Sequence, residues 1–524
     1  MITADSGVII CGCHGKIGQS LPVNEIACSL RQVGLDLRIV IGDDFCQSQE
    51  LSRLIEESGF AAPVIGACSL LKSKVNSLEP SGHNSVVVDL LHEVEGPHSK
   101  AELVGRVKLL LCSQLHRQAG SKVIHQRVAK FEFPNAGGEV TRRQLFELPL
   151  PKYSLPMFVE RSKCAAKEKC RICWENCSFD AIKFEQGGVV IDQAVCWGCG
   201  VCVAACPFNA IFYSTFSFEE IEREIEGLLL PNGLLEPRIL AITCKTCISD
   251  SLGKFHYPAN VLPLEIPCFA MVSPWFLLRA FDLGVQGLVL ISSECKFELA
   301  LKQLEGTLEF AQELLGKLGI EPRRVRILGD DELEQGLTAF AQEVGRLSST
   351  PLRFSSPVEC SGEGPWLPTL LKGMGEKLGV SLQGTVVGAV PFGKLELSSS
   401  KCTMCGLCTL ECPTGALSLP SEEAGTCRLL FRQESCIGCG RCVNSCPEKC
   451  LKLQNVLELE CLHKMPEVLF QDEIARCREC GAPIAFQSML AGIKEKLSGS
   501  GRDAFYLSLC PKCRIRSQFK LVRK

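Results

Sequence analysis

The feature that most constrains this chain is a pair of matching cysteine runs in its second half. In each run, four cysteines are separated by gaps of two, two and three residues, and a proline follows the last one. The runs are Cys402, Cys405, Cys408 and Cys412-Pro413, then Cys436, Cys439, Cys442 and Cys446-Pro447. At this spacing three thiolates share a tight loop, and the fourth lies on the following helical turn. Zinc is disfavoured, because zinc sites rarely use three cysteines at successive gaps of two.

These runs resemble those of the bacterial two-cluster ferredoxins, in which the fourth cysteine of each run ligates the other cluster. The resemblance implies two [4Fe-4S] clusters in residues 396–455, termed here the second cysteine block. One would be held by Cys402, Cys405, Cys408 and Cys446, and the other by Cys412, Cys436, Cys439 and Cys442. Gly406, Gly438 and Gly440 suit loops whose backbone N–H groups point at sulfur.

An earlier segment, residues 155–217, repeats the pattern less regularly and is termed the first cysteine block. Its second half matches the run fully, whereas its first half has a gap of five residues after Cys164 and Ser178 in place of proline. We call the exchange of the fourth cysteine between the two clusters the crossing rule. Applied here, it assigns two [4Fe-4S] clusters, one to Cys164, Cys170, Cys173 and Cys206 and one to Cys177, Cys196, Cys199 and Cys202. The alternative is a single cluster beside a degenerate half.

Four more cysteines occur in residues 236–347, where strand-like runs alternate with helical patterns. Cys244 and Cys247 follow one strand-like run, Cys268 follows a second and Cys295 follows a third. Thiolates at the ends of parallel strands can converge at one edge of the sheet. Their spacing fits either zinc or a [2Fe-2S] cluster.

The order of short motifs in this segment resembles the delta (iron-sulfur) subunit of methyl-viologen-reducing hydrogenase. The motifs are Cys244-Lys-Thr-Cys247, Tyr257-Pro-Ala-Asn-Val261, Ile266-Pro-Cys268, Phe276-Leu-Leu-Arg-Ala-Phe281, Gly284-Val-Gln-Gly287 and Leu318-Gly-Ile-Glu-Pro-Arg323. The resemblance implies one [2Fe-2S] cluster on Cys244, Cys247, Cys268 and Cys295, and electron transfer to a heterodisulfide reductase. The family usually has a second cysteine close to Cys295, which this chain lacks.

Residues 1–150 carry strand and helix patterns typical of a small α/β domain. Three motifs resemble the opening domain of the A subunit of heterodisulfide reductase: Cys11-Gly-Cys13-His14-Gly15, Cys46-Gln-Ser-Gln-Glu50 and Gly66-Ala-Cys68-Ser69. The resemblance implies a further [4Fe-4S] cluster on Cys11, Cys13, Cys46 and Cys68. The alternative is a set of buried thiols that pack as small hydrophobes.

That family continues into a flavin-binding domain, for which this sequence offers no counterpart. No Gly-x-Gly-x-x-Gly motif follows a strand with an acidic residue about 20 positions on, so neither an FAD nor an NAD site is predicted.

Two Cys-x2-Cys pairs mark the last module, residues 470–520. Cys477 and Cys480 are separated from Cys510 and Cys513 by 29 residues, which is typical of a zinc ribbon that binds one Zn²⁺. A rubredoxin-like iron site is the alternative. Among the cysteines outside all of these sets, Cys450 is a candidate neighbour of a cluster, because it follows Cys446 by four residues.

Composition favours metal over disulfides. The chain has 34 cysteines among 524 residues, and its N-terminus lacks the leader that usually precedes a secreted disulfide-rich protein. The longest apolar stretch, residues 269–291, is broken by Arg279 and Asp282, so no membrane span is expected and the location is predicted to be cytoplasmic. The balance of 56 basic and 59 acidic residues argues against nucleic acid as a partner.

The sequence therefore predicts a multidomain α/β and α+β chain in which two ferredoxin-like blocks flank a hydrogenase-delta-like domain. Residues 348–395, rich in Ser, Pro and Gly, are expected to form a linker with one helix. Strands are expected at Gly7–Cys11, Leu35–Ile41, Ala62–Cys68, Val86–Leu90 and Val261–Ile266, and helices at 99–132 and Pro274–Leu283.

Many cluster sites without a substrate motif predict an electron-transfer subunit of an oxidoreductase complex, with no catalytic residue of its own. The expected cofactors are four [4Fe-4S] clusters, a fifth at the N-terminal cysteines, one [2Fe-2S] cluster and one Zn²⁺. The expected partners are heterodisulfide-reductase-like, flavin-containing, hydrogenase or dehydrogenase subunits. The alternatives are a self-contained reductase with its substrate near the N-terminal cysteines and a redox-sensing scaffold.

Overall fold

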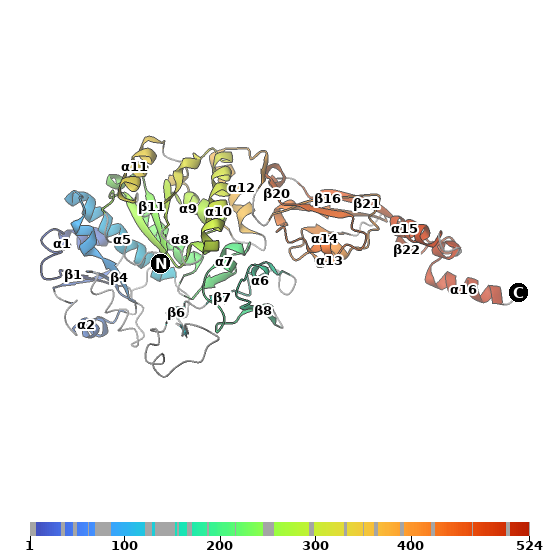
Figure 1. The fold of residues 1–524 in the computed structure, drawn as a ribbon, viewed down its shortest axis with the longest axis horizontal. Coiled ribbons are helices and arrows are strands. Elements are labelled where there is room, and N and C mark those ends of the chain that lie inside the picture. Colours follow the sequence, from blue (N-terminus) through green and yellow to red (C-terminus); the bar gives the residue numbers. More distant parts are fainter. Residues whose placement is uncertain are drawn as a thin grey trace.

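The computed structural model describes most of the chain. The described residues are 7–32, 37–43, 45, 50–60, 62–68, 85–120, 128–130, 152–154, 157–164, 170–185, 188–214, 216–244, 256–292, 298–329, 333–348, 351–360, 365–387, 392–420, 425–463, 465–498 and 504–522. Two α/β domains and the first cysteine block form one body, the second cysteine block lies beside it, and a narrow C-terminal arm extends beyond (Figure 1). None of the helices in the described ranges combines the length and apolar character that crossing a bilayer requires.

The N-terminal domain is built on a four-stranded parallel sheet with the order β2-β1-β3-β4. Its elements are β1 (Gly7–Cys11), α1 (Val23–Arg31), β2 (Arg38–Gly42), α2 (Glu50–Ser58), β3 (Val64–Ala67), β4 (Val86–Asp89), α4 (Leu90–Glu95) and α5 (Lys100–Gly120). Every residue of the central strand β1 is buried, as expected for an apolar run in a parallel sheet that is covered on both faces. The four strands expected in this domain are all present.

The helix expected over residues 99–132 is too long. Helix α5 ends at Gly120, and Val128–Lys130 forms strand β5, which pairs antiparallel with β6 (Lys152–Ser154). Glycine is a poor helix former, and the short segment beyond it gains a partner strand that the local sequence pattern does not reveal.

The hydrogenase-delta-like domain contains a second four-stranded parallel sheet, with the order β12-β11-β13-β14. Its elements are β11 (Ile239–Cys244), β12 (Val261–Ile266), α9 (Pro274–Leu283), β13 (Gly287–Ile291), α10 (Glu298–Lys317), β14 (Val325–Leu328) and α11 (Leu333–Arg346). Helix α9 is capped by Ser273, whose hydroxyl accepts from the Phe276 amide, and by Gly284 in the left-handed conformation. These caps explain why α9 has the bounds expected from sequence, and β12 also has its expected bounds.

The first cysteine block is joined to both domains through α8 (Phe218–Leu228), which contacts α5 of the N-terminal domain and α9 of the hydrogenase-delta-like domain. Its elements are β7 (Met157–Val159), α6 (Ile172–Glu175), β8 (Ile182–Glu185), β9 (Gly188–Ile191), α7 (Val201–Ala205), β10 (Ile211–Tyr213) and the following α8. Helix α8 starts with a capping box between Ser217 and Glu220 and packs along α5. The two helices approach closely at Gly227, where a Cβ would lie 2.5 Å from the Ser113 Cα.

The second cysteine block shares its sheet with the C-terminal arm. Its elements are β16 (Lys394–Leu397), α13 (Leu407–Glu411), β17 (Leu417–Ser418), β18 (Thr426–Phe431), α14 (Arg441–Asn444) and β19 (Leu451–Gln454). Strand β21 (Glu467–Arg476) pairs with β18 on one side and with β22 (Pro483–Phe486) on the other. The arm ends with α15 (Gln487–Ser498) and α16 (Pro511–Val522), so the metal-binding module expected at 470–520 is attached through a continuous sheet.

The segment expected to be a linker, residues 348–395, is largely structured in its described part. Helix α12 (Trp366–Leu378) buries Leu370, Leu371 and Met374 in the core, and β15 (Thr385–Val387) pairs with β20 (Val456–Glu458). The second cysteine block is therefore fixed to the hydrogenase-delta-like domain by packed elements.

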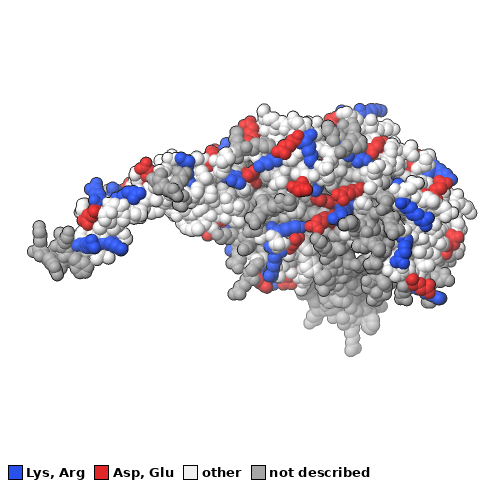
Figure 2. Space-filling model, turned by 180° about the vertical axis from the view of Figure 1, so that it is seen from behind, with Lys and Arg blue, Asp and Glu red and all other residues white. Residues whose placement is uncertain are grey.

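On the described surface of the face seen in Figure 2, charge is distributed without a large single-sign patch. Figure 2 shows Lys and Arg interspersed with Asp and Glu over the described surface of one face. This mixed surface agrees with the near-neutral formal charge of -3.

A buried ion pair within the N-terminal domain also contacts the hydrogenase-delta-like domain through Arg106. The guanidinium of Arg106, on α5, binds the Glu93 carboxylate and donates to the carbonyl of Ala259 at 2.8 Å. Burial opposes ionisation of Glu93, but Arg106 outweighs this effect and lowers the pKa of Glu93 to about 2. The pair therefore stabilises the folded state above the ordinary carboxyl pKa and loses this contribution as the pH falls toward 2.

Replacing Glu93 with Gln should destabilise the chain by about 3–5 kcal/mol, because it leaves the Arg106 charge buried without a partner. The matched control is Glu25→Gln, which removes an exposed pair with Lys100 and should change stability by about 1 kcal/mol or less. Anaerobic thermal unfolding followed by circular dichroism measures both. Equal midpoints for the two variants would contradict the stabilising role of the buried pair.

Candidate iron-sulfur and metal centres

In the second cysteine block, glycines set the two loops that gather sulfur. Gly406 and Gly440 precede the short helices α13 and α14 and adopt left-handed φ values of 76° and 67°. This conformation is unfavourable for residues with a Cβ, and it aims the third cysteine of each run, Cys408 or Cys442, back toward the loop.

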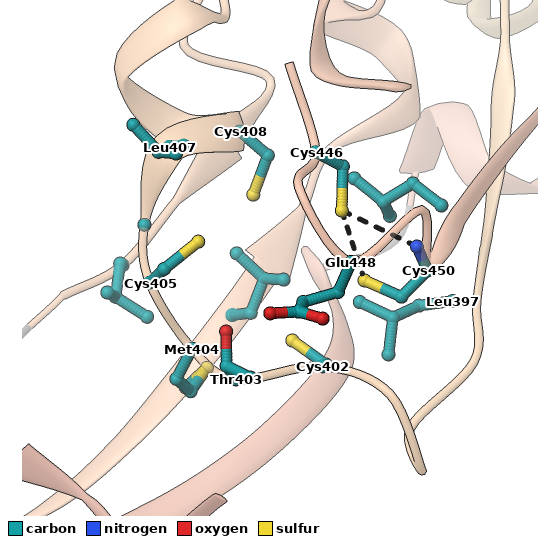
Figure 3. Close-up of a pocket in the computed structure, with 14 residues that line it drawn as sticks. Leu397, Cys402, Thr403, Met404, Cys405, Leu407, Cys408, Cys446, Glu448 and Cys450 are labelled. Carbon is teal, nitrogen blue, oxygen red and sulfur yellow. Dashed lines mark hydrogen bonds between the residues drawn. The ribbon is translucent and has the colours of Figure 1, made fainter. Parts of the chain in front are cut away.

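The eight cysteines of the two runs in this block separate into the two groups that the crossing rule predicts. The first group surrounds a hollow of about 420 Å³ and comprises Cys402, Cys405, Cys408 and Cys446 (Figure 3). The second surrounds a hollow of about 330 Å³ and comprises Cys412, Cys436, Cys439 and Cys442. The groups are neighbours: burial raises the pKa of Cys442 to about 12, and the thiols around it, including Cys408 of the other group, add to the rise.

The first cysteine block has the same organisation despite its irregular first half. Gly200 precedes α7 with a φ of 88°, and Cys177, Cys196, Cys199 and Cys202 line a hollow of about 350 Å³. Cys164 lies with Cys170 and Cys206 in one apolar cluster. Burial raises the pKa of Cys173 to about 12, with further contributions from Cys206, Cys170 and Cys164. The unusual spacing after Cys164 therefore does not keep it from its expected group.

Backbone amides point at sulfur in these groups. The Gly198 amide donates to the Cys196 sulfur at 3.4 Å, and the Ala210 amide donates to the Cys206 sulfur at 3.3 Å. Four converging thiols with amide donors around a hollow fit a [4Fe-4S] cluster, because such hydrogen bonds stabilise the negative charge that the ligand sulfurs carry.

The two blocks meet at Ile437, which is 2% exposed. Ile437 packs with Cys170 and Phe208 of the first block, and Cys206 and Cys439 flank the same apolar cluster. Burial raises the pKa of Cys170 to about 12, and thiols of both blocks, Cys206 and Cys439, add to the rise. A cysteine group of one block thus faces a cysteine group of the other.

The hydrogenase-delta-like domain places two of its four expected ligands at one edge of the sheet. Cys244 ends β11, Cys268 follows β12, and both are buried. The Cys244 sulfur lies 3.5 Å from the carbonyl oxygen of Pro267. The other two expected ligands, Cys247 and Cys295, lie outside the described residues.

Tyr213 connects this edge to the first cysteine block, a role that the sequence did not suggest. Its side chain is fully buried, and its hydroxyl donates to the Gly198 carbonyl at 3.1 Å. Burial raises the pKa of Tyr213 well above its ordinary value, and thiols on both sides add to the rise: Cys268, Cys202, Cys199 and Cys244. The loop between Cys196 and Cys202 also lies against the segment that follows Cys268, since a Cβ at Gly200 would lie 3.1 Å from the Met271 Cβ.

The N-terminal domain also gathers thiols where its parallel strands end. Cys11 ends β1, Cys68 follows β3, and the sulfurs of Cys11 and Cys13 are 3.5 Å apart. Burial raises the pKa of Cys13, and hydrogen bonding with Cys11 and Cys68 adds to the rise. Cys13 and His14 adopt positive φ values of 49° and 56°, which are uncommon for such residues and occur most often at functional sites. Cys46 lies outside the described residues.

The C-terminal arm brings its four cysteines into one compact set. The sulfurs of Cys477, Cys480, Cys510 and Cys513 all lie within 4.8 Å of one another. The Cys510 amide donates to the Cys477 sulfur at 3.3 Å, and this hydrogen bond is the main reason that the pKa of Cys477 falls to about 6. A set of four sulfurs this compact fits a single tetrahedral ion.

Comparisons with known proteins agree with this division of the chain. Residues 239–344 match the family model of the methyl-viologen-reducing hydrogenase delta subunit. Residues 189–212 match a 4Fe-4S binding domain, and residues 401–450 match a 4Fe-4S dicluster domain. The chain therefore contains two ferredoxin-type iron-sulfur domains and a segment of the hydrogenase delta type.

Curated relatives identify the family more closely. The iron-sulfur D subunit of the F420-non-reducing hydrogenase of Archaeoglobus profundus is 30% identical over 132 residues, which are 23% of this chain and 95% of that protein. The chain belongs, through this segment, to the hydrogenase delta subunit family.

Heterodisulfide reductase subunits resemble a larger share of the chain. The A subunit of the ferredoxin:CoB-CoM heterodisulfide reductase of Methanosarcina mazei is 26% identical over 346 residues, and its ferredoxin/F(420)H(2)-dependent counterpart in Methanosarcina acetivorans is 30% identical over 325. These matches cover 58% and 55% of this chain but only 41% and 38% of the two relatives. Both resemblances found in the sequence are thereby confirmed.

The contact at Tyr213 predicts that Gly200→Ala will be poorly tolerated. A Cβ at this position would lie 2.2 Å from the Tyr213 hydroxyl, and the left-handed backbone adds strain of about 1–2 kcal/mol. The matched control is Gly306→Ala in α10, where a Cβ has open space and should stabilise the helix by up to about 1 kcal/mol.

Adding Tyr213→Phe to Gly200→Ala should restore part of the lost stability, because it removes the hydroxyl and leaves the backbone strain. Anaerobic thermal unfolding distinguishes these variants. A Gly200→Ala chain as stable as the unmodified one would contradict the close packing described here.

Proposed function

We propose that this chain relays electrons along a row of iron-sulfur sites that runs from the hydrogenase-delta-like domain, through the first cysteine block, to the second. The observation that carries the proposal is the contact between each site and the next. Tyr213 links the Cys244 edge to the first block, and Ile437 links the first block to the second. Within each block the two cysteine groups are adjacent, because α6 packs against α7 and α13 packs against α14.

Each group would be held by the cysteines that the crossing rule assigns. The four [4Fe-4S] ligand sets would be Cys402, Cys405, Cys408, Cys446; Cys412, Cys436, Cys439, Cys442; Cys164, Cys170, Cys173, Cys206; and Cys177, Cys196, Cys199, Cys202. When bound, such a cluster takes up and releases electrons at a potential set by charge, burial and hydrogen bonds to sulfur. The protein supplies the buried surroundings, the amide donors and the fixed spacing.

The hydrogenase-delta-like domain would be the end of the row that meets a donor or acceptor protein. We propose one [2Fe-2S] cluster on Cys244, Cys247, Cys268 and Cys295, supported by the match of this segment to a hydrogenase iron-sulfur subunit. The heterodisulfide reductase relatives make a heterodisulfide-reductase-like or flavin-containing subunit the proposed partner at the other end.

A fifth [4Fe-4S] cluster at the N-terminal cysteines is supported by an internal parallel. Both parallel sheets have the same strand order, and in each a cysteine ends the first strand, Cys11 in β1 and Cys244 in β11. In the sequence, Cys46 and Cys68 follow the second and third strands of one domain, as Cys268 and Cys295 do in the other. We therefore propose that Cys11, Cys13, Cys46 and Cys68 hold a cluster.

The compact sulfur set of the C-terminal arm is best suited to Zn²⁺, which favours four tetrahedral thiolates. Bound zinc would hold the two Cys-x2-Cys loops together in a module whose small size gives it little core of its own. Zinc and a rubredoxin-like iron site are distinguished by metal analysis, since iron would give a visible absorbance that zinc lacks.

Metal and flavin analysis of the anaerobically purified chain tests the whole proposal. We expect about 22 Fe, from five [4Fe-4S] clusters and one [2Fe-2S] cluster, about one Zn, and no stoichiometric flavin. The Cys402→Ala variant should lose about four Fe, whereas Cys427→Ala, which removes a buried thiol outside both hollows, should lose none. An iron content near eight, or one flavin per chain, would contradict the proposal.

A further inference from the structure

The second cysteine block contains a fifth thiol that the four-cysteine sets leave unused. Each of the two blocks contains two four-cysteine runs. In all four runs, the residue four positions after the last cysteine is buried beside a ligand set. It is alanine three times, at Ala181, Ala210 and Ala416, and cysteine once, at Cys450. The chain thus offers three internal examples of the same position without a thiol.

The backbone at Cys450 matches that of its alanine counterpart. The Ala210 amide donates to the Cys206 sulfur at 3.3 Å, and the Cys450 amide donates to the Cys446 sulfur at 3.4 Å. Since this contact is present at both positions, the feature that distinguishes the Cys446 site is the added thiol of Cys450.

The Cys450 thiol lies between two sulfurs of one ligand set. Its sulfur is 3.4 Å from that of Cys446, and the side chain lines the same hollow as Cys402. Figure 3 shows the Cys450 sulfur directed between these two residues, at the edge of the hollow lined by Cys405 and Cys408. With 6% of its surface exposed, the side chain is shielded from water.

The four ligands of this site are already supplied by the run, so Cys450 has a different task. A thiol is a weak donor, and in a water-excluded position its hydrogen bond is stronger than at the surface. An added electron increases the negative charge on the ligand sulfurs. A donor beside them therefore stabilises the reduced state more than the oxidised state.

We propose that Cys450 is a positioning residue whose thiol donates a hydrogen bond to the Cys446 sulfur and raises the reduction potential of the Cys402–Cys405–Cys408–Cys446 site. The inference rests on the proposed [4Fe-4S] cluster at that site. The couple involves one electron, the thiol keeps its proton, and no bond to Cys450 forms or breaks. The higher reduction potential would favour the reduced state of this site, which lies at the end of the row where Cys405 is exposed.

The test is an EPR-monitored redox titration of the full-length chain, with the signal of this site identified by its loss in Cys402→Ala. Cys450→Ala introduces the residue that the other three runs have at this position, and Cys450→Ser keeps a hydrogen-bond donor. At a fixed potential we expect Cys450→Ala to lower the ratio of reduced to oxidised site by up to about tenfold, which is 59 mV for one electron. Cys450→Ser should stay close to the unmodified chain, and Cys427→Ala should leave the potential unchanged.

Three outcomes would overturn the inference. An unchanged potential in Cys450→Ala would show that the thiol has no such effect. Equal shifts in Cys450→Ala and Cys450→Ser would indicate a packing effect, and loss of about four Fe in Cys450→Ala would make Cys450 a ligand. If the unmodified chain lacks a cluster at this site, iron analysis reveals that first, and the proposed function fails together with the inference.

Discussion

Thiols that are buried together resist ionisation, because burial disfavours the charged form and each thiolate repels the next. In this chain the pKa of Cys170, Cys173, Cys436 and Cys442 is raised to about 12 in this way. Metal clusters are bound by thiolates, so a bound cation must offset this resistance, and cluster binding is linked to the folding of each block. The tight glycine loops, the amide donors and the apolar surroundings all serve sites that are unfavourable without metal.

The two α/β domains also bury cysteines close together, and both do so with the same sheet topology. Each has a four-stranded parallel sheet in which the first strand is central and ends in a buried cysteine, Cys11 or Cys244. At the carboxyl edge of such a sheet, thiols from several strands can converge without disturbing the hydrogen-bonded ladder. The ferredoxin-type blocks gather thiols from successive loops, whereas the α/β domains gather them from separate strands. Tyr213 lies between one site of each kind, the first cysteine block and the Cys244 edge of the hydrogenase-delta-like domain.

Sequence reasoning succeeded where local signals decide the structure. Helix α9 has the expected bounds because Ser273, Pro274 and Gly284 mark its ends. The resemblance to two-cluster ferredoxins, in turn, anticipates which run cysteines line each hollow of the second block. Sequence reasoning failed where distant partners decide. The Ser-, Pro- and Gly-rich composition of residues 348–395 suggests a linker with one helix; α12 is such a helix, but the local sequence does not show that it buries Leu370 and Met374 against the core. The contacts of Ile437 and Tyr213 join segments far apart in the sequence, so no local pattern could reveal them.

The central claim is that the cysteine sites form one continuous row across both blocks, and spin–spin coupling between reduced clusters tests it most directly. In the fully reduced Cys402→Ala chain, which lacks the adjacent site of the same block, the EPR signal of the Cys412–Cys436–Cys439–Cys442 site should be broadened by its neighbour across Ile437. Removing that neighbour with Cys170→Ala and Cys173→Ala should narrow the signal. Removing the more distant site with Cys196→Ala and Cys199→Ala should leave it unchanged. A signal unaffected by loss of the neighbour, with about four Fe missing, would contradict a continuous row.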